Sequence, residues 1–436
     1  MSDKTTTFAE AGDDNARVVV PLSERRATWD VSLVAAGYCI AMSGLFTGAA
    51  LMAGMELFQV IIAALIGNTV LALYGGLLGA AGAREGVGTA MLARHAFGRE
   101  GSKIVGLVLA ITMLGWFSVQ VGFFGNTINA LFPEGGILTQ PKIAAFWGGI
   151  LMIGTAYLGY KGLSLVSRIA IPAVVITAAW GALTAVNSAG GWEHIASIVP
   201  PESFGLGTGI VIVVGSFAAG ASAQADITRY AKDEKAAWIS TVFGYMCANA
   251  FVILAGFLTS VSTGTGDLPS AMVSLGLGAP ALVVLIAAQW TTNDNNLYTS
   301  SLGLSALVKL KKSVIVLITG LFATAIGVLG MADYFINWLI ILGIAIPPMA
   351  GILIADYYVL NGRKYSFGEG VRYNKWNLTT FVSWGFSSVA AYNIEWGSGA
   401  INSLFLGFVV YIILSKIESL RVMGNVGECH EDSAGF

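Results

Sequence analysis

Charged residues are scarce in this chain of 436 residues. Asp, Glu, Lys and Arg make up 11% of it and hydrophobic residues 56%, whereas a soluble domain is about 25% charged. This scarcity excludes an ordinary soluble domain. The formal net charge of −2 also gives no basic surface for nucleic acid. We therefore expect an all-α membrane protein that crosses the bilayer many times and contacts membrane lipid, without a nucleic-acid partner.

Cysteine and histidine are scarce as well. The three cysteines show no disulfide or zinc spacing, and the three histidines have no metal-ligating neighbour. No pairing of a nucleophile with a base is visible, so the sequence favours no enzyme. A short apolar run behind a basic start is also lacking. Residues 1–30 are mostly polar, which is typical of an uncleaved cytoplasmic tail.

Long apolar segments fill the rest of the chain. Segments of about 18 to 25 apolar residues predict membrane-spanning helices. With the N-terminus inside, every Lys and Arg except Lys142 falls in a cytoplasmic piece. This asymmetry supports a count of twelve spans, with both termini in the cytoplasm. The predicted spans are 31–51, 59–81, 104–131, 143–160, 165–187, 207–225, 237–261, 280–308, 313–332, 334–356, 378–394 and 400–416.

Segments 1 and 6 have weak points near mid-depth. Small residues gather around Ser43 and Gly44 in segment 1, and Gly215-Ser216 is the weak point of segment 6. Because five helices separate the two starts, the two segments occupy equivalent places in halves of opposite orientation. This pattern is typical of inverted repeats whose discontinuous helices form the binding site. The alternative is that glycine marks close helix packing in both segments.

Segment 8 holds a polar string, Trp290 to Asn296, between apolar runs. Unsatisfied polar groups are costly in a bilayer core, so we expect an intramembrane site for an ion or a polar solute. Ala288, Thr291 and Thr292 share one helix face. Their oxygens, with carbonyls from a broken segment 1, would make a cage for a small hard cation. The alternative is that each threonine bonds its own i−4 carbonyl.

Aromatic and amide side chains predict where a flat ring binds. Trp116 and Gln120, at i and i+4, offer a stacking face beside a donor and an acceptor, which suits a planar heterocycle with polar edges. Phe217, beside the weak point of segment 6, can cover the opposite face of such a ring. Asn293 carries a donor and an acceptor that can read its edge. The alternatives are an interfacial role for Trp116 and simple packing for Phe217.

Asp294 is the one carboxylate deep in an apolar span. It is either a proton-coupling group or a structural acid bonded to freed helix N–H groups. We favour the structural role, because Thr291 and Thr292 already suggest a cation site that does not need a carboxylate.

Four short motifs extend these observations over nearly the whole chain. They are Gly115-Trp116-Phe117, Gly215-Ser216-Phe217, the string from Trp290 to Asn295, and Ile346-Pro-Pro348 with Ile354-Ala-Asp356-Tyr. In them the chain resembles the nucleobase–cation symporter-1 family, and within it the bacterial cytosine permease type. The resemblance implies a LeuT-like fold with a 5+5 inverted repeat. It divides the chain into a tail (1–30), a core (31–356, with repeats 31–187 and 207–356), two additional helices (378–416) and a cytoplasmic tail (417–436).

The resemblance also implies the ligands. Trp116 and Phe217 would sandwich the ring, and Ser216 and Asn293 would bond its edge. Ala41 would face the substrate beside the break in segment 1. Sodium, the co-transported ion, would be held by backbone carbonyls and threonine hydroxyls of Gly37, Ile40, Ala288, Thr291 and Thr292.

Two positions depart from the cytosine permease type. That type looks to have a glutamine three residues before the tryptophan, where this chain has Met113, and an asparagine where this chain has Ala288. The amide is here Gln120, four residues after the tryptophan, which is more like the hydantoin-transporting branch. These departures leave the identity of the ring open.

The sequence thus predicts a symporter that imports cytosine or a related nucleobase across the bacterial inner membrane, coupled to sodium through alternating access. The alternative is a hydantoin, allantoin or purine permease of the same family, coupled to protons instead. A channel is disfavoured because the site is asymmetric. No obligate protein partner is expected.

Overall fold

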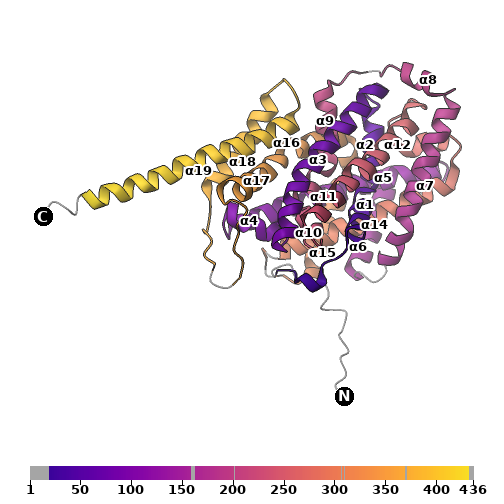
Figure 1. The fold of residues 1–436 in the computed structure, drawn as a ribbon. Coiled ribbons are helices and arrows are strands. Elements are labelled where there is room, and N and C mark those ends of the chain that lie inside the picture. Colours follow the sequence, from indigo (N-terminus) through magenta and orange to yellow (C-terminus); the bar gives the residue numbers. More distant parts are fainter. Residues whose placement is uncertain are drawn as a thin grey trace.

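Helices make up nearly all of the chain in the computed structural model (Figure 1). The structure describes residues 19–158, 163–200, 202–305, 307–308, 310–368 and 371–431. This confirms the all-α class for the described residues. The helices up to residue 200 are α1 (Thr28–Cys39), α2 (Met42–Leu51), α3 (Leu57–Glu85), α4 (Thr89–Phe97), α5 (Gly101–Leu131), α6 (Pro141–Leu158), α7 (Leu163–Ser188) and α8 (Trp192–Ser197).

The next helices run from residue 206 to residue 360. They are α9 (Leu206–Ser222), α10 (Ala225–Thr228), α11 (Glu234–Val242), the π-helix η3 (Phe243–Asn249), α12 (Ala250–Val261), α13 (Leu268–Ser274), α14 (Gly278–Ser305), α15 (Lys312–Val328), α16 (Phe335–Ala345), α17 (Pro347–Ile354) and the π-helix η5 (Ala355–Leu360). Two more, α18 (Leu378–Asn393) and α19 (Gly399–Glu431), pack on each other beside α17 (Figure 1). Short 3₁₀ turns are η1 (Leu22–Glu24), η2 (Ile137–Thr139) and η4 (Met331–Tyr334).

The membrane-spanning helices agree with the predicted spans. Seven helical stretches of the described chain are long and apolar enough to cross a bilayer, and α1 with α2 passes the same test as a pair bent by 50°. Helices α6, α14, α15 and α18 coincide with the remaining predicted spans. The chain is therefore a multi-pass membrane protein, and the count of twelve stays a prediction. Two boundaries differ, since α1 begins inside the predicted tail and α19 continues to Glu431.

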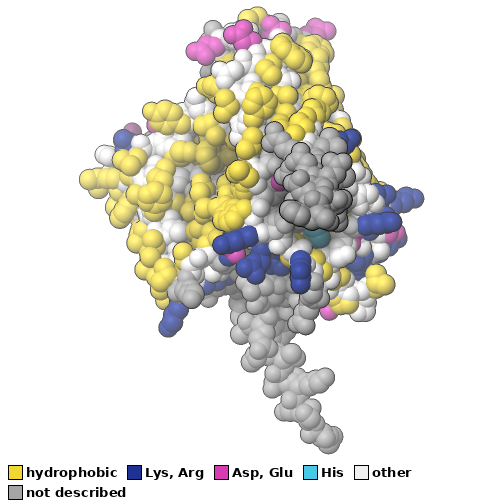
Figure 2. Space-filling model, turned by 90° about the vertical axis from the view of Figure 1, so that its left-hand side faces the viewer, with side chains coloured by type: hydrophobic (Ala, Val, Ile, Leu, Met, Phe, Trp, Pro, Cys, Tyr) yellow, Lys and Arg dark blue, Asp and Glu magenta, His cyan; other side chains and the backbone are white. Residues whose placement is uncertain are grey.

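The surface has the division that a bilayer requires. On the face shown in Figure 2, a broad apolar belt covers much of the middle of the molecule, with a group of Asp and Glu above it and most of the visible Lys and Arg below it. Large exposed hydrophobic side chains lie on many spanning helices, for example Leu73, Ile176, Phe322 and Val389. Such a belt matches the apolar interior of a membrane.

Close helix packing surrounds the two helices that carry the predicted breaks. Helix α2 packs against α12, and α9 packs against α3. A Cβ on Gly48 would lie 1.9 Å from the carbonyl oxygen of Ile253, and one on Gly256 would lie 2.0 Å from that of Leu45. Only glycine permits this approach of two backbones, which is the usual way for helices to pack tightly in a membrane.

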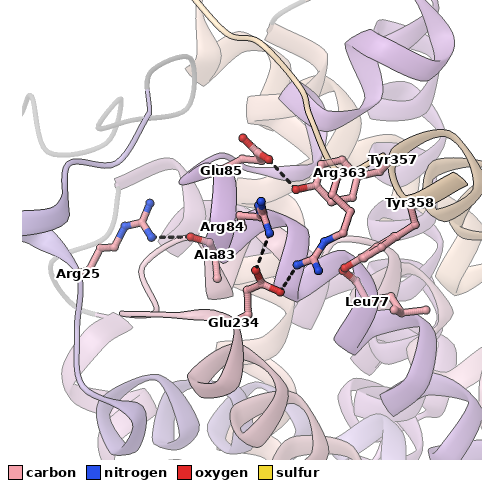
Figure 3. Close-up of polar contacts among 9 residues, drawn as sticks. All are labelled: Arg25, Leu77, Ala83, Arg84, Glu85, Glu234, Tyr357, Tyr358 and Arg363. Atoms are coloured by element: carbon pink, nitrogen blue, oxygen red, sulfur yellow. Dashed lines mark hydrogen bonds and ion pairs between the residues drawn. The ribbon is translucent and has the colours of Figure 1, made fainter. Parts of the chain in front are cut away.

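A polar network joins the helix ends at the face where α3 ends and α11 begins (Figure 3). Glu234 forms ion pairs with Arg84, at 3.3 Å, and with Arg363. The hydroxyl of Tyr357 donates to Glu85 at 2.5 Å, and Arg25 Nη1 donates to the Ala83 carbonyl at 2.5 Å. The network ties the segment before α1 and the turn after η5 to the ends of α3 and α11.

Candidate functional site

The break in the first span lies at Ile40 and Ala41. Ile40 N–H still donates to the Ala36 carbonyl at 2.8 Å, but Ile40 (ψ 69°) and Ala41 (φ −110°, ψ 151°) leave the helical conformation. Helix α2 then starts at Met42, so the predicted weak point at Ser43 and Gly44 lies within its first turn. The break frees carbonyls at the end of α1, which are available to a cation or solute.

The sixth predicted span is kinked rather than cut. Phe217 has non-helical angles (φ −135°, ψ 15°) inside α9, directly after the predicted weak point. A Cβ on Gly215 would lie 1.9 Å from the Leu339 carbonyl oxygen, so α9 approaches α16 at the kink. The hydroxyl of Ser216 donates to the Val213 carbonyl at 2.7 Å, which leaves its oxygen lone pairs able to accept.

Helix α5 presents an aromatic ring and an amide to the same side. Met113, Trp116 and Gln120 lie three and four residues apart and line one cavity. Gln120 is 2% exposed, and its Oε1 has no hydrogen-bond partner among the described residues. A buried polar atom without a partner is costly, so this oxygen is suited to accept a hydrogen bond from a polar ligand.

Helix α14 contributes two hydroxyls that share one acceptor. Thr291 Oγ1 donates to the Ala288 carbonyl at 3.1 Å, and Thr292 Oγ1 donates to the same oxygen at 2.8 Å. This local bonding is the alternative considered for threonine in a membrane helix. It does not exclude cation binding, because a hydroxyl that donates its proton keeps its lone pairs. Carbonyl and hydroxyl oxygens are the donors that small hard cations prefer.

These elements meet at one cavity of about 160 Å³. A cavity of about 150 Å³ accommodates a benzene molecule, so this space suits a single flat ring. The aromatic faces of Trp116 and Phe217 belong to its wall, and both side chains are at most 7% exposed. Its lining residues are Gly37, Tyr38, Ile40, Ala41, Met42, Ser43, Met113, Trp116, Gln120, Ala170, Ile171, Val174, Ser216, Phe217, Ala219, Gly220, Ala288, Thr291, Thr292, Asn295 and Asn296.

All the predicted ligand residues line this cavity except Asn293. Asn293 is fully buried and its amide donates to the Phe117 carbonyl at 3.2 Å and to Met152 Sδ at 3.3 Å. Its contact with the substrate edge therefore stays a prediction. Asn293 lies outside the cavity lining because, at 3.6 residues per turn, it is about 100° around the helix from Thr292 and faces α5 and α6.

Four polar residues of the cavity were not among the predicted ligands: Tyr38, Ser43, Asn295 and Asn296. Asn295 and Asn296 follow Thr292 by three and four residues, a spacing that was a usable signal. Tyr38 gave no signal. Its ring meets Phe217 edge-on at a centroid distance of 5.6 Å, and Gly220 leaves room for it, since a Cβ there would lie 2.8 Å from the Tyr38 ring.

Asp294 lies away from the cavity, in a hydrogen-bonded group between α14 and α6. Its Oδ1 accepts from Thr155 Oγ1 at 2.8 Å, and Trp290 Nε1 donates to the same Thr155 oxygen at 2.9 Å. These contacts agree with a structural role, although the donor is a side-chain hydroxyl rather than the backbone N–H groups expected.

Aromatic side chains from α2, α5 and α16 pack together beside Trp116. The rings of Phe46 and Phe123 stack at 3.8 Å, and Phe335 meets the edge of Phe123 at 5.1 Å and that of Trp116 at 6.0 Å. Tyr38, which lines the cavity, is 42% exposed.

The fold and the cavity define a membrane transporter: spanning helices interrupted at mid-depth surround a pocket with polar and aromatic walls. A family model described as a permease for cytosine/purines, uracil, thiamine and allantoin matches residues 19–421. The chain belongs to this family of secondary transporters, and it is not an enzyme.

Individual relatives agree with the family. The chain is 31% identical over 398 residues to the cytosine permease of Escherichia coli (strain K12), covering 91% of this chain and 93% of the relative. Two solved structures of Mhp1, a nucleobase-cation-symport-1 family transporter, share the fold. The inward-facing structure has a TM-score of 0.78 at 18% identity, and the closed one with bound bromovinylhydantoin has 0.75 at 17%. Both cover 93% of this chain and 95% of the solved chain.

Proposed function

We propose that this protein is a sodium-coupled symporter that imports cytosine or a closely related single-ring nucleobase. The observation that carries the proposal is that Trp116, Phe217 and the unpartnered Gln120 line one cavity with the broken end of α1 and the threonine pair of α14. A ring site and a cation site that share one cavity suit coupled transport, since occupation of one changes the affinity of the other.

The substrate ring lies between Trp116 and Phe217. Their indole and phenyl faces supply stacking, while Gln120 and Ser216 bond the polar edge of the ring. Ala41, in the extended stretch between α1 and α2, leaves room for the ring beside the break. In place of Asn293, we assign a further edge contact to Asn296, because it lines the cavity one turn beyond Thr292. The volume of about 160 Å³ favours one ring over a fused pair.

Sodium is held between α1 and α14. Its proposed ligands are the carbonyl oxygens of Gly37 and Ile40, at the interrupted end of α1, and the carbonyl oxygen of Ala288 in α14. The hydroxyls of Thr291 and Thr292 complete the set. All five donors are neutral oxygens, a set without the carboxylate that a divalent ion usually requires.

Twelve spans arranged as a 5+5 inverted repeat, with both termini in the cytoplasm of a bacterium, complete the proposal. It is supported by the basic side chains gathered toward one end of the apolar belt (Figure 2). In this orientation α1, with Tyr38, lies on the cytoplasmic side of the break, and α2, with Phe46, lies on its periplasmic side.

A hydantoin is the second candidate substrate. In the cytosine permease type a glutamine precedes the tryptophan and an asparagine stands at the position of Ala288. This chain instead has Gln120 after Trp116, and alanine at position 288. The closed Mhp1 structure contains bromovinylhydantoin, which adds weight to a five-membered ring. Proton coupling is the corresponding alternative for the ion.

Ligand-dependent thermal stability of the purified protein tests the proposal. Cytosine, uracil, hypoxanthine and hydantoin are titrated with and without sodium at two pH values. We expect stabilisation by a single-ring compound, with sodium lowering its Kd and the ring lowering the sodium Kd by the same factor. A Kd that depends on pH and not on sodium would replace sodium with protons. No stabilisation by any of the rings would reject the function.

A further inference from the structure

Asn293 occupies the centre of the contact between α14, α5 and α6. Its side chain is 0% exposed, and its amide nitrogen lies 3.2 Å from the Phe117 carbonyl oxygen and 3.3 Å from Met152 Sδ. Phe117 and Met152 are also fully buried. The amide therefore joins three helices at a position that water and lipid do not reach.

One of these bonds holds the backbone of Phe117, the residue after the predicted stacking residue Trp116. Phe117 directly follows Trp116, and successive residues of a helix point about 100° apart. Holding the Phe117 carbonyl against α14 therefore fixes the rotation of α5 about its axis. That rotation determines how far the Trp116 indole projects into the cavity lined by Thr291 and Thr292.

The other end of the same amide acts on the cavity wall. Asn296 Nδ2 donates to Asn293 Oδ1 at 3.4 Å, and Asn296 lines the cavity. Asn293 thus contacts the α5 backbone on one side and a cavity-lining amide on the other, while its own side chain does not line the cavity.

We propose that Asn293 is a positioning residue for the ring site: it sets the orientation of Trp116 relative to α14 without touching the substrate. This inference rests on the proposed function of the cavity. A residue that acts by orienting Trp116 changes the stacking of every flat ring, so it should affect the Kd of all rings alike. A residue that hydrogen-bonds the polar edge of the ring should instead discriminate between rings with different donors and acceptors.

Gln289 provides a matched control. It lies one turn before Asn293 on the same face of α14, is fully buried, and also bonds α14 to α5, through Gln289 Nε2 and Thr127 Oγ1 at 3.2 Å. Thr127 is more than two turns away from Trp116 along α5. Replacing Gln289 therefore removes a similar buried interhelical bond at a place remote from the stacking residue.

The experiment compares Asn293→Leu with Gln289→Leu by binding of cytosine, uracil, hypoxanthine and hydantoin to purified protein. For every ring that the wild type binds, we expect Asn293→Leu to raise Kd by a similar factor, about tenfold, as loss of one buried hydrogen bond would produce. Gln289→Leu should lower the thermal stability comparably and leave each Kd within about twofold of the wild-type value. In a Trp116→Ala background, Asn293→Leu should add no further loss.

Three results would overturn the inference. They are a Kd increase confined to rings that share one edge pattern, equal Kd increases in the Asn293 and Gln289 variants, and an additive loss in the Trp116→Ala background. If leucine prevents folding, Asn293→Ala and Gln289→Ala repeat the comparison. Failure of the wild type to bind any ring would instead reject the proposed function, so the two claims fail by different results.

Discussion

Two faces of α14 carry similar polar side chains, but the fold uses them differently. The face with Thr291 and Thr292 borders the cavity, and both hydroxyls bond within their own helix. The face with Gln289 and Asn293 packs on α5, and both amides bond across the helix interface. Polarity in a membrane helix therefore does not by itself identify a ligand residue. What matters is whether the polar group already has a partner on another helix.

The difference follows from the cost of an unsatisfied polar group in an apolar medium. An amide has two donors and an acceptor, and its own helix cannot satisfy all of them, so a packed amide needs a neighbouring helix. A threonine hydroxyl can donate to its own i−4 carbonyl and keep its lone pairs free. The cavity face thus has unused acceptors. On the packing face Asn293 Oδ1 accepts from Asn296, whereas Gln289 Oε1 has no partner among the described residues.

The greatest loss of stability is expected at Thr155 of α6, which bonds two side chains of α14. Its hydroxyl accepts from Trp290 and donates to Asp294, so Thr155→Val leaves the buried Asp294 carboxylate and the half-buried Trp290 indole without this partner. We expect a loss of about 3 kcal/mol in the free energy of unfolding, measured in detergent. Thr155→Ser keeps the hydroxyl and should retain most of the stability. Equal stability of Thr155→Val and wild type would contradict the structural role of this group.

The next largest effect lies on the cavity side, at Trp116. Trp116→Ala removes one stacking face and should weaken ring binding by about 2 kcal/mol, roughly thirtyfold. Trp116→Phe preserves an aromatic face and should lose less. Isothermal titration with the ring that binds wild type measures both. Wild-type affinity in Trp116→Ala would move the substrate away from this cavity.

A smaller effect is expected at Thr292. Thr292→Ala removes one proposed sodium ligand and should raise the sodium concentration for half-maximal ring binding about fivefold, corresponding to about 1 kcal/mol. The order of preference among rings should not change. Thr292→Ser keeps the oxygen and should bind sodium like the wild type. A change in ring preference with unaltered sodium dependence would place Thr292 in the ring site instead.

The least change in stability and sodium dependence is expected at Thr319, which serves as the control for Thr292. Its hydroxyl donates to the Ile315 carbonyl at 2.7 Å, the same local bond that Thr292 makes, but Thr319 does not line the cavity. Thr319→Val should change stability by at most about 0.5 kcal/mol and leave the sodium dependence unaltered. An altered sodium dependence would show that the local bond, rather than the cavity, accounts for the effect at Thr292.

Much of the site was predictable because short spacings on a helix translate directly into faces. Trp116 with Gln120, and Ala288 with Thr291 and Thr292, each lie on one face at three- or four-residue spacing, and the structure brings both sets to one cavity. The position of Asn293 outside the cavity lining was not predictable, because a residue type tells what a side chain can bond and not which way it points. The break in the first span is at Ile40 and Ala41 rather than at the smaller Ser43 and Gly44.

From the sequence alone it was possible to predict that this chain spans a membrane and where its apolar helices run. The residue types suited to a flat ring and a hard cation were also recognisable. These properties depend on composition and local periodicity, which need no knowledge of distant neighbours. Only the tertiary structure decided which polar side chains meet in the cavity and which are used for packing, including the unforeseen place of Tyr38 beside Phe217. That choice depends on the rotation of each helix against its neighbours, which is determined by long-range packing such as the contact of α9 with α3.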